Sequence, residues 1–153
     1  MEVRTVNINF TDAGEDISTY HEAIRFAGNI LIKQGLIESQ YIDACIDREV
    51  DFPTGLLLEG GLGVAMPHGN SNFVNDDSIS VVRTLRPITF GRMEDKSLTV
   101  DCHLIFNLAL ASGENHLTIL RKLIRLFQDT EFIEACRTLP ADKAADLVKK
   151  KLS

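Results

Sequence analysis

The segment FPTGLLLEGGLGVAMPHGN spans Phe52–Asn70, and the rest of this 153-residue chain can be interpreted outward from it. Four glycines interrupt the segment before a short apolar run at residues 64–66. Because a residue that precedes proline favours extended backbone, Met66 is expected to end a short strand. Pro67 restricts φ in the turn that follows. We therefore predict a stiffly held imidazole at His68.

The composition is that of an ordinary globular protein, with 44% hydrophobic and 25% charged residues. The length suits one domain with a substantial core, so we expect a single domain over residues 1–153. A net charge of −6 argues against a nucleic-acid interface, which needs clustered Lys and Arg. The charge suits brief contact with a basic protein partner, and simple solubility also explains it.

The three cysteines, Cys45, Cys102 and Cys136, show no C-x-x-C spacing. This argues against both a disulfide framework and a zinc ribbon, so we expect reduced thiols and a cytoplasmic location. The N-terminus has no signal-type apolar core. No stretch approaches the ~20 apolar residues of a membrane span, and no direct membrane insertion is expected.

Hydrophobic periodicity predicts alternating strands and helices. The alternation of Val6, Ile8 and Phe10 is typical of a half-buried strand, whereas the apolar run at 98–110 indicates a central strand buried on both faces. We predict strands at 5–10, 63–66, 78–84, 87–91 and 98–110, and helices at 19–33, 39–49, 112–128, 130–137 and from 140 onward. This interleaving predicts an α/β sandwich with a mixed β-sheet flanked by helices.

Helix boundaries are predicted from capping residues. Thr19 and Glu22 form a capping-box pattern, and Ser112 and Thr130 are expected to cap later helices. Pro140 is expected in the first turn of the last helix. The helix over 112–128 is expected to bury Leu117, Leu120, Ile124 and Phe127.

The four histidines have different expected environments. His21 lies on the polar side of a helix and is expected in water, and His103 is expected as a hydrogen-bonded core residue of a buried strand. His116 falls in the first turn of a helix, where the dipole disfavours imidazolium and favours a bound anion. His68 lies on no apolar helix or strand face. A packing role is therefore hard to assign to it, and the residues alone leave open whether it is functional.

The motif GVAMPHG at 63–69 resembles the active-site signature of enzyme IIA domains of the sugar phosphotransferase system, in the mannitol/fructose structural class. The resemblance extends over nearly the whole chain, through the segments 80–83, 86–91 and 114–117. Arg48-Glu49 together with the segment 52–59 looks most like the galactitol-specific branch.

The resemblance implies a type-2 phosphocarrier domain that carries a phosphoryl group on His68. It also implies that Arg48 and His116 flank the phosphorylated ring. Catalysis of such transfers depends on positioning and on neutralising charge. A neutral imidazole is a competent nucleophile near pH 7, and its other nitrogen then needs an acceptor, for which we expect a backbone carbonyl. An arginine fork matches phosphate oxygens.

By resemblance, the donor is the phosphohistidine of the histidine-containing phosphocarrier protein. The acceptor is a cysteine of enzyme IIB, which acts with membrane enzyme IIC in uptake of galactitol or a related polyol. Both contacts are expected to be small, transient and apolar around His68. Met66 and Phe73 are candidates for this surface, with packing in the core as the alternative.

Two other functions remain open at this stage. The first is a regulatory module of the same fold, in which phosphorylation of His68 controls partner binding. The second is a metal-dependent hydrolase, although a site from His68, His103 and His116 would need three remote ligands. The glycines at 60–63 match neither a dinucleotide fingerprint nor a P-loop. No cofactor is therefore implied.

Overall fold

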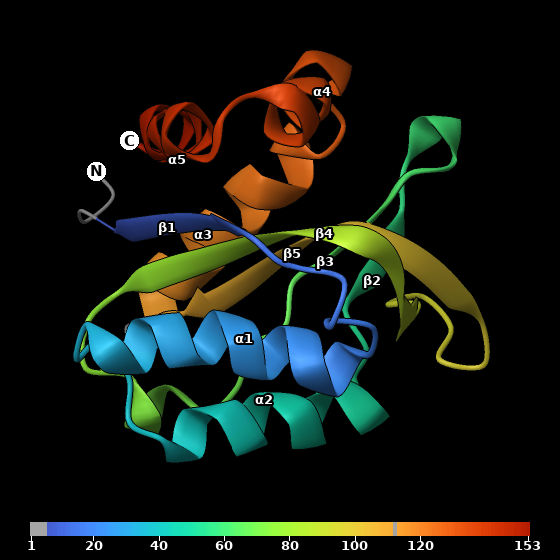
Figure 1. Cartoon of the computed structure of the whole chain (residues 1–153). Helices are drawn as coiled ribbons and strands as arrows, with labels where there is room; N and C mark the ends of the chain where they lie inside the picture. Colours follow the sequence, from blue (N-terminus) through green and yellow to red (C-terminus); the bar gives the residue numbers. More distant parts are fainter. Residues whose placement is uncertain (1–5, 112) are drawn as a thin grey trace.

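The computed structural model describes residues 6–111 and 113–153, which form a five-stranded mixed sheet covered by helices on both faces (Figure 1). This confirms the predicted α/β sandwich. The strands are β1 (Asn7–Asp12), β2 (Gly55–Leu57), β3 (Gly63–Ala65), β4 (Ser78–Gly91) and β5 (Thr99–Ala109). The helices are α1 (Tyr20–Lys33), α2 (Gln40–Asp51), α3 (Gly113–Leu126), α4 (Thr130–Thr138) and α5 (Ala141–Leu152), with short 3₁₀ turns at Glu59–Gly61 (η1) and Ser71–Phe73 (η2).

The strand order is β1-β4-β5-β3-β2. β1 pairs in parallel with β4 and β3 pairs in parallel with β5, whereas the β4–β5 and β2–β3 pairs are antiparallel. β5 therefore occupies the centre of the sheet, as its apolar run predicts, and both of its faces are buried over residues 104–109.

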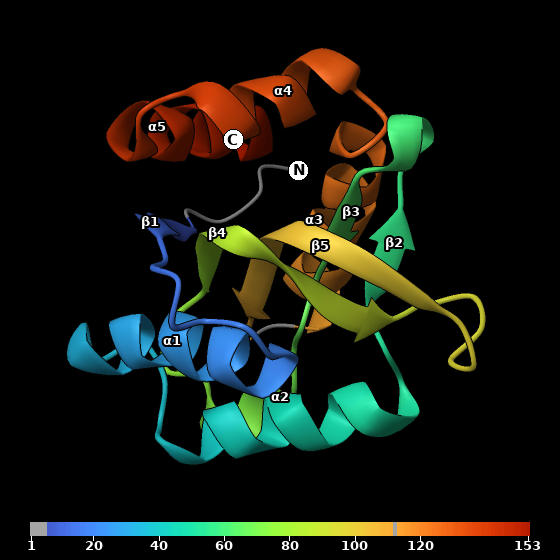
Figure 2. The ribbon, with the colours of Figure 1, turned by 45° about the vertical axis from the view of Figure 1, so that its right-hand side comes forward.

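Each face of the sheet has its own hydrophobic core. One face packs against α3, α4 and α5, and the other packs against α1 and α2 (Figure 1). The alternation predicted for the first strand is confirmed, because Val6 and Phe10 are buried and Ile8 packs beside them. The β2–β3 hairpin lies at one edge of the sheet (Figure 2). Side chains of the hairpin, of the end of α3 and of α4 line a groove there.

The strands predicted at 78–84 and 87–91 are a single strand, β4. Its pairing with β5 shifts register between Arg83 and Ile88, so the turn-like Arg86-Pro87 is accommodated as an irregularity inside one strand. The prediction of two strands was therefore wrong. Residue 5, at the predicted start of the first strand, lies outside the described residues.

The predicted helix caps are correct in part. The capping box of Thr19 and Glu22 is confirmed, with hydrogen bonds in both directions. Asp129, rather than Thr130, caps α4 and accepts from the amides of the first turn. Pro140 is the cap residue before α5, one position earlier than predicted. Ser112 lies outside the part of the chain that the structure describes.

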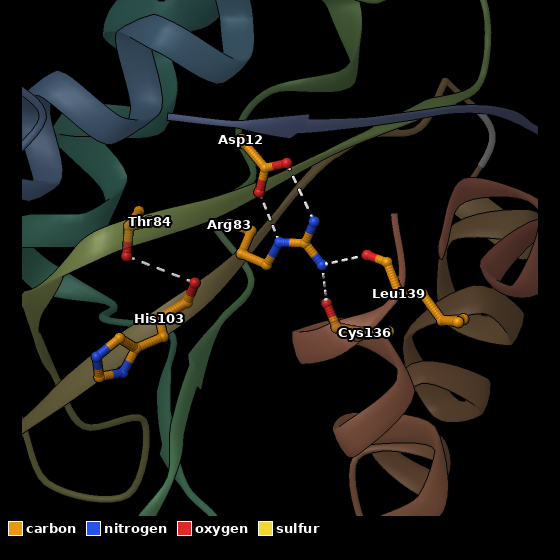
Figure 3. A network of polar contacts seen from close by, with 6 residues as sticks. All are labelled: Asp12, Arg83, Thr84, His103, Cys136 and Leu139. Atoms are coloured by element: carbon orange, nitrogen blue, oxygen red, sulfur yellow. Dashed lines mark hydrogen bonds and ion pairs between the residues drawn. The ribbon is translucent and has the colours of Figure 1, made fainter. Parts of the chain in front are cut away.

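Arg83 joins β4 to β1 and to the end of α4 (Figure 3). Its guanidinium donates to both carboxylate oxygens of Asp12, at 2.6 and 3.0 Å, and to the carbonyls of Cys136 and Leu139, at 2.9 and 2.7 Å. Carbonyls at a helix C-terminus lack intrahelical partners, so this arginine satisfies them. Arg83 is therefore a structural residue that holds β1, β4 and the end of α4 together.

Candidate active site around His68

The turn that carries His68 is hydrogen-bonded on both sides of the histidine. The Pro67 carbonyl accepts from the amide of Leu108 at 2.9 Å, and the Gly69 amide donates to the hydroxyl of Tyr41 at 3.0 Å. That hydroxyl in turn donates to the Leu108 carbonyl at 2.5 Å. The turn is thus tied to the central strand β5 and to helix α2. This confirms a stiffly held imidazole.

Gly69 permits close packing of the turn on α2. A Cβ at this position would lie 3.1 Å from the amide nitrogen of Cys45 and 3.2 Å from atoms of Ala44. The glycine therefore lets the turn sit directly on the helix backbone.

The tautomer of His68 follows from its hydrogen bond. Nδ1 lies 2.8 Å from the carbonyl oxygen of Met66. A carbonyl oxygen can only accept, so Nδ1 carries the proton and Nε2 keeps its lone pair. The expected backbone acceptor is confirmed.

The electrostatic environment keeps His68 neutral. Burial lowers the pKa of His68 to about 4, an effect opposed by the hydrogen bond to Met66 and reinforced by the positive charges of Arg48 and His116. Near pH 7 the ring is therefore an uncharged nucleophile with an available Nε2.

Arg48 lies near the C-terminal end of α2 and lines the same cleft as His68. The volume of this cleft is about 450 Å³. Its guanidinium lies over the ring of Phe52, 5.3 Å from the centroid, and Nη1 donates to the Phe52 carbonyl at 3.4 Å. Within residues 6–111 and 113–153, Arg48 forms no ion pair. Its positive charge is thus free to interact with an anion in the cleft.

His116 stands in the first turn of α3 with its ring against that of His68. The two centroids are 5.3 Å apart and the planes are inclined at 73°. Partial burial and the charge of Arg48 lower the pKa of His116, and Asp77 opposes this effect. The structure therefore brings together all three residues predicted for the site.

Asp77, a residue that the sequence analysis missed, fixes the start of α3. Its carboxylate is buried and accepts from the amide of Ala111 and from the side chain of Asn115, each at 2.7 Å. An acid at a helix N-terminus is favoured by the dipole. Asp77 thereby positions the turn that carries His116.

Glu49 and Thr54 are two further residues that the sequence analysis did not assign to the site. Glu49 is 5% exposed, and burial raises its pKa to about 7 despite hydrogen bonds from Thr54 and the nearby charge of Arg48. The sequence does indicate that Glu49 is buried, because it follows Ile42 by two helical turns on the buried stripe of α2. A carboxyl group on an apolar stripe needs a specific partner.

The other histidines lie elsewhere. His21 is exposed, as expected. His103 is only half-buried, and its Nδ1 has no hydrogen-bond partner among the described residues, so the prediction of a hydrogen-bonded core histidine was wrong. Its ring projects from β5 while its main-chain oxygen accepts weakly from Thr84 (Figure 3). Across the described part of the chain, no three His, Cys, Asp or Glu side chains are grouped to hold a metal ion.

The rim of the cleft combines apolar side chains with the charged residues Asp51 and Lys96, and α3 contributes to its apolar part. Leu117 and Ile124, predicted to be buried, are 55% and 39% exposed. The helix is apolar on two sides, and the side of Ile119 and Leu123 packs in the core, which leaves the other side toward His68. Periodicity alone could not choose between these two sides.

The predicted contact surface also changes in detail. Met66 is fully buried, so it belongs to the core and not to a partner surface. Phe73 is half-buried and packs against the core beside α1 and α2. Exposed apolar side chains near His68 are instead those of Phe52 and Met93, with 63% and 42% exposure, together with the α3 side chains.

Comparison with protein families identifies the class. Residues 5–150 match the family described as "Phosphoenolpyruvate-dependent sugar phosphotransferase system, EIIA 2". The chain therefore belongs to this family of enzyme IIA components, which are phosphoryl carriers in the uptake of sugars and polyols. The resemblance noted in the sequence is confirmed.

Individual relatives cover most of the chain. The galactitol-specific EIIA component of Escherichia coli (strain K12) is 26% identical over 141 residues, covering 92% of this chain and 93% of that protein. The mannitol-specific phosphotransferase enzyme IIA component of Enterococcus faecalis (strain ATCC 700802 / V583) is 30% identical over 125 residues, covering 78% and 79%. These relatives have different sugars in their names, so the similarity supports the class and does not select a sugar.

A solved structure confirms the fold. The complex of mannitol enzyme IIA with phosphorylated enzyme IIB from Escherichia coli contains a chain that is 28% identical and aligns with a TM-score of 0.67. The alignment covers 95% of the present chain and 93% of the other. In the described residues of this chain, no helix combines the length and apolar character needed to span a bilayer.

Proposed function

We propose that Nε2 of His68 carries the phosphoryl group. The observation that carries the proposal is the 2.8 Å hydrogen bond from Nδ1 to the Met66 carbonyl, which leaves the other ring nitrogen unprotonated in a cleft lined by Arg48. A ring held in this tautomer and kept neutral by burial has its lone pair ready for attack on phosphorus.

The reaction has two steps. The Nε2 lone pair forms a bond to phosphorus as the nitrogen–phosphorus bond of the donor breaks, and its electron pair returns to the donor imidazole. In the second step a cysteine thiolate attacks phosphorus, and the electron pair of the broken bond returns to Nε2. Arg48 neutralises the charge on the three phosphoryl oxygens in both steps, and His116, neutral near pH 7, can donate a hydrogen bond to them. The Met66 carbonyl stabilises the positive charge that develops on the ring.

The proposed donor is the phosphohistidine of the histidine-containing phosphocarrier protein, and the proposed acceptor is a cysteine of enzyme IIB coupled to membrane enzyme IIC. The apolar rim of Phe52, Met93 and the exposed side of α3 suits two brief contacts made in turn. A relative of 28% identity is known in complex with phosphorylated enzyme IIB, which supports the acceptor. Galactitol or a related polyol is the proposed sugar, on the similarity to a galactitol-specific relative.

The test of the carrier is transfer of label from phosphoenolpyruvate through the general phosphotransferase proteins. The wild-type chain is expected to take up one acid-labile phosphoryl group. His68→Ala is expected to take up none, and His21→Ala, which removes an exposed histidine of α1, serves as the matched control and keeps full labelling. Labelling of His68→Ala at the wild-type level would contradict the proposal.

The sugar branch is tested separately. The phosphorylated chain is offered galactitol-type and mannitol-type enzyme IIB proteins, and the rate of label transfer to each is measured. Preferential transfer to the galactitol type is expected. Equal or preferential transfer to the mannitol type would overturn the assignment to galactitol, and no transfer to any enzyme IIB would overturn the transport role.

A further inference from the structure

A series of hydrogen bonds, joined through the backbone of Met66, links a buried acid to the imidazole of His68. Glu49 Oε1 accepts from the amide and the hydroxyl of Thr54, at 2.7 and 3.0 Å, and Oε2 lies 3.1 Å from the same hydroxyl. The Thr54 oxygen accepts from the amide of Met66 at 3.1 Å. The carbonyl of Met66 accepts from Nδ1 of His68. Four residues from three segments are thus connected in series.

We propose that Glu49 is a positioning residue for phosphoryl transfer, which acts through Thr54 and the Met66 backbone to hold His68 in the tautomer with a free Nε2. The inference rests on the proposed role of His68 and adds the residues that set its geometry.

The backbone amides of Thr54 and Met66 can only donate, which fixes the direction of their hydrogen bonds, and the carboxylate form of Glu49 accepts from the Thr54 hydroxyl. A Thr hydroxyl has one proton and two lone pairs. Because Glu49 accepts that proton, a lone pair of Thr54 is left for the Met66 amide. With its amide anchored and Pro67 tied to Leu108, the Met66 carbonyl is held on both sides at the position where it meets Nδ1.

The burial of Glu49 supports a specific role. Together with burial of the thiols, its charge raises the pKa of Cys45 and Cys102, and the residue lies on the buried stripe of α2. An apolar side chain would fill such a position without the cost of burying a carboxyl group. Both oxygens of Glu49 instead bind Thr54, which precedes the segment that leads into the active-site turn.

Loss of these hydrogen bonds would free the His68 ring to change its tautomer. Without an acceptor at Thr54 the amide of Met66 is buried and unpaired, so the backbone shifts to find another partner. The Met66 carbonyl then no longer holds Nδ1, and His68 exchanges between both neutral tautomers. In one of these tautomers Nε2 carries a proton and cannot attack phosphorus.

The decisive experiment uses Thr54→Val, which keeps the shape of the side chain and removes its hydroxyl. In protein labelled with ¹⁵N-histidine, the wild-type spectrum should show a protonated Nδ1 and an unprotonated Nε2 for His68 at pH 7. Thr54→Val should show a mixture of tautomers, and the rate of phosphoryl transfer should fall by between about tenfold and a hundredfold. Thr54→Ser, which restores the hydroxyl, should recover both properties.

The matched control is Thr84→Val. Thr84 is likewise buried at 6% exposure and donates to a backbone carbonyl, but it lies on β4 outside the cleft. Its substitution should leave the tautomer and the transfer rate unchanged. A similar change in both variants would show a general packing effect and would overturn the proposal.

Glu49→Gln tests the acid itself with little change of shape. An amide NH2 group, which donates, replaces one acceptor oxygen of the carboxylate. We therefore expect a partial shift of His68 to the second tautomer and a rate of phosphoryl transfer lower by at least about threefold. A folded Glu49→Gln or Thr54→Val protein with only the Nδ1-protonated tautomer and the wild-type rate would overturn the inference. The NMR measurement needs no partner protein, so its result stands apart from the labelling test of His68 as the carrier.

Discussion

The rings of His68 and His116 meet edge to face with their centroids 5.3 Å apart, one in the turn after β3 and the other in the first turn of α3. The contact depends on two anchors, because the first turn is tied to β5 and the second to Asp77. Together with burial, the positive charge of Arg48 lowers the pKa of both rings. The three side chains are therefore grouped as the proposed phosphoryl transfer at His68 requires.

Arg48→Ala should slow phosphoryl transfer by roughly a hundredfold, the scale expected when one charge-stabilising group is removed from a preorganised site. Arg48→Lys should recover only part of the rate, because lysine lacks the planar fork. Rapid-quench measurement of label on His68 gives these rates. The unfolding midpoint should change little, since the contacts of Arg48 with Phe52 are half-exposed. Wild-type transfer rates in Arg48→Ala would remove this residue from the mechanism.

His116→Ala should raise the pKa of His68 from its value of about 4. The substitution opens the ring to water, and it also removes a neighbouring group whose charge opposes protonation of His68. NMR titration of the His68 ring measures the shift directly. The transfer rate is expected to fall in the same variant. A titration curve identical to that of the wild type would show that the two rings are not coupled.

The pH dependence of stability should contain two opposing contributions. The folded-state pKa of His68 is about 4, below the unfolded value of 6.5, so its contribution is lost as pH falls from 6.5 to 4. The folded-state pKa of Glu49 is about 7, above the unfolded value of 4.5, so its contribution is lost as pH rises from 4.5 to 7. Each amounts to as much as about 3 kcal/mol, so they largely cancel between pH 4.5 and 6.5.

Variants separate these two contributions. Relative to the wild type, His68→Ala should lose stability as pH rises through this window, and Glu49→Gln should gain it. Urea unfolding at half-unit pH intervals measures both trends. Parallel stability curves for the two variants and the wild type would contradict the assigned shifts.

Leu117→Asp should weaken encounter with the partner proteins without unfolding the chain, because the side chain is 55% exposed on the apolar side of α3 next to His116. The KM for the phosphocarrier protein should rise by at least about tenfold, because the substitution places a charged side chain in a small apolar interface. Leu85→Asp is the matched control, since Leu85 is 67% exposed on β4 outside the cleft. An equal effect of both substitutions would locate the contact elsewhere.

Local patterns predicted much of the fold. The capping box at Thr19, the alternation of β1 and the continuous apolar run of β5 are properties of neighbouring residues, so they can be read without tertiary information. The turn at His68 could be predicted for the same reason, because proline and glycine restrict or release the backbone locally.

Other features needed contacts between distant segments. The buried side of α3 was predicted only in part, with Phe127 buried as expected and Leu117 exposed. The helix is apolar on two sides, and only its packing shows that Ile119 faces the core. The roles of Asp77 and Glu49 could not be assigned because acids are ordinarily surface residues, and their hydrogen-bond partners lie in other elements.

The sequence by itself determined the fold class, which follows from local patterns, and it indicated His68, Arg48 and His116 as candidate site residues through the resemblance of a short motif. Only the tertiary structure decided which nitrogen of His68 is free, how Arg48 and His116 approach it, and which side of α3 borders the cleft. The physical reason is that a tautomer, a pKa and a surface each depend on groups that become neighbours only when the chain folds.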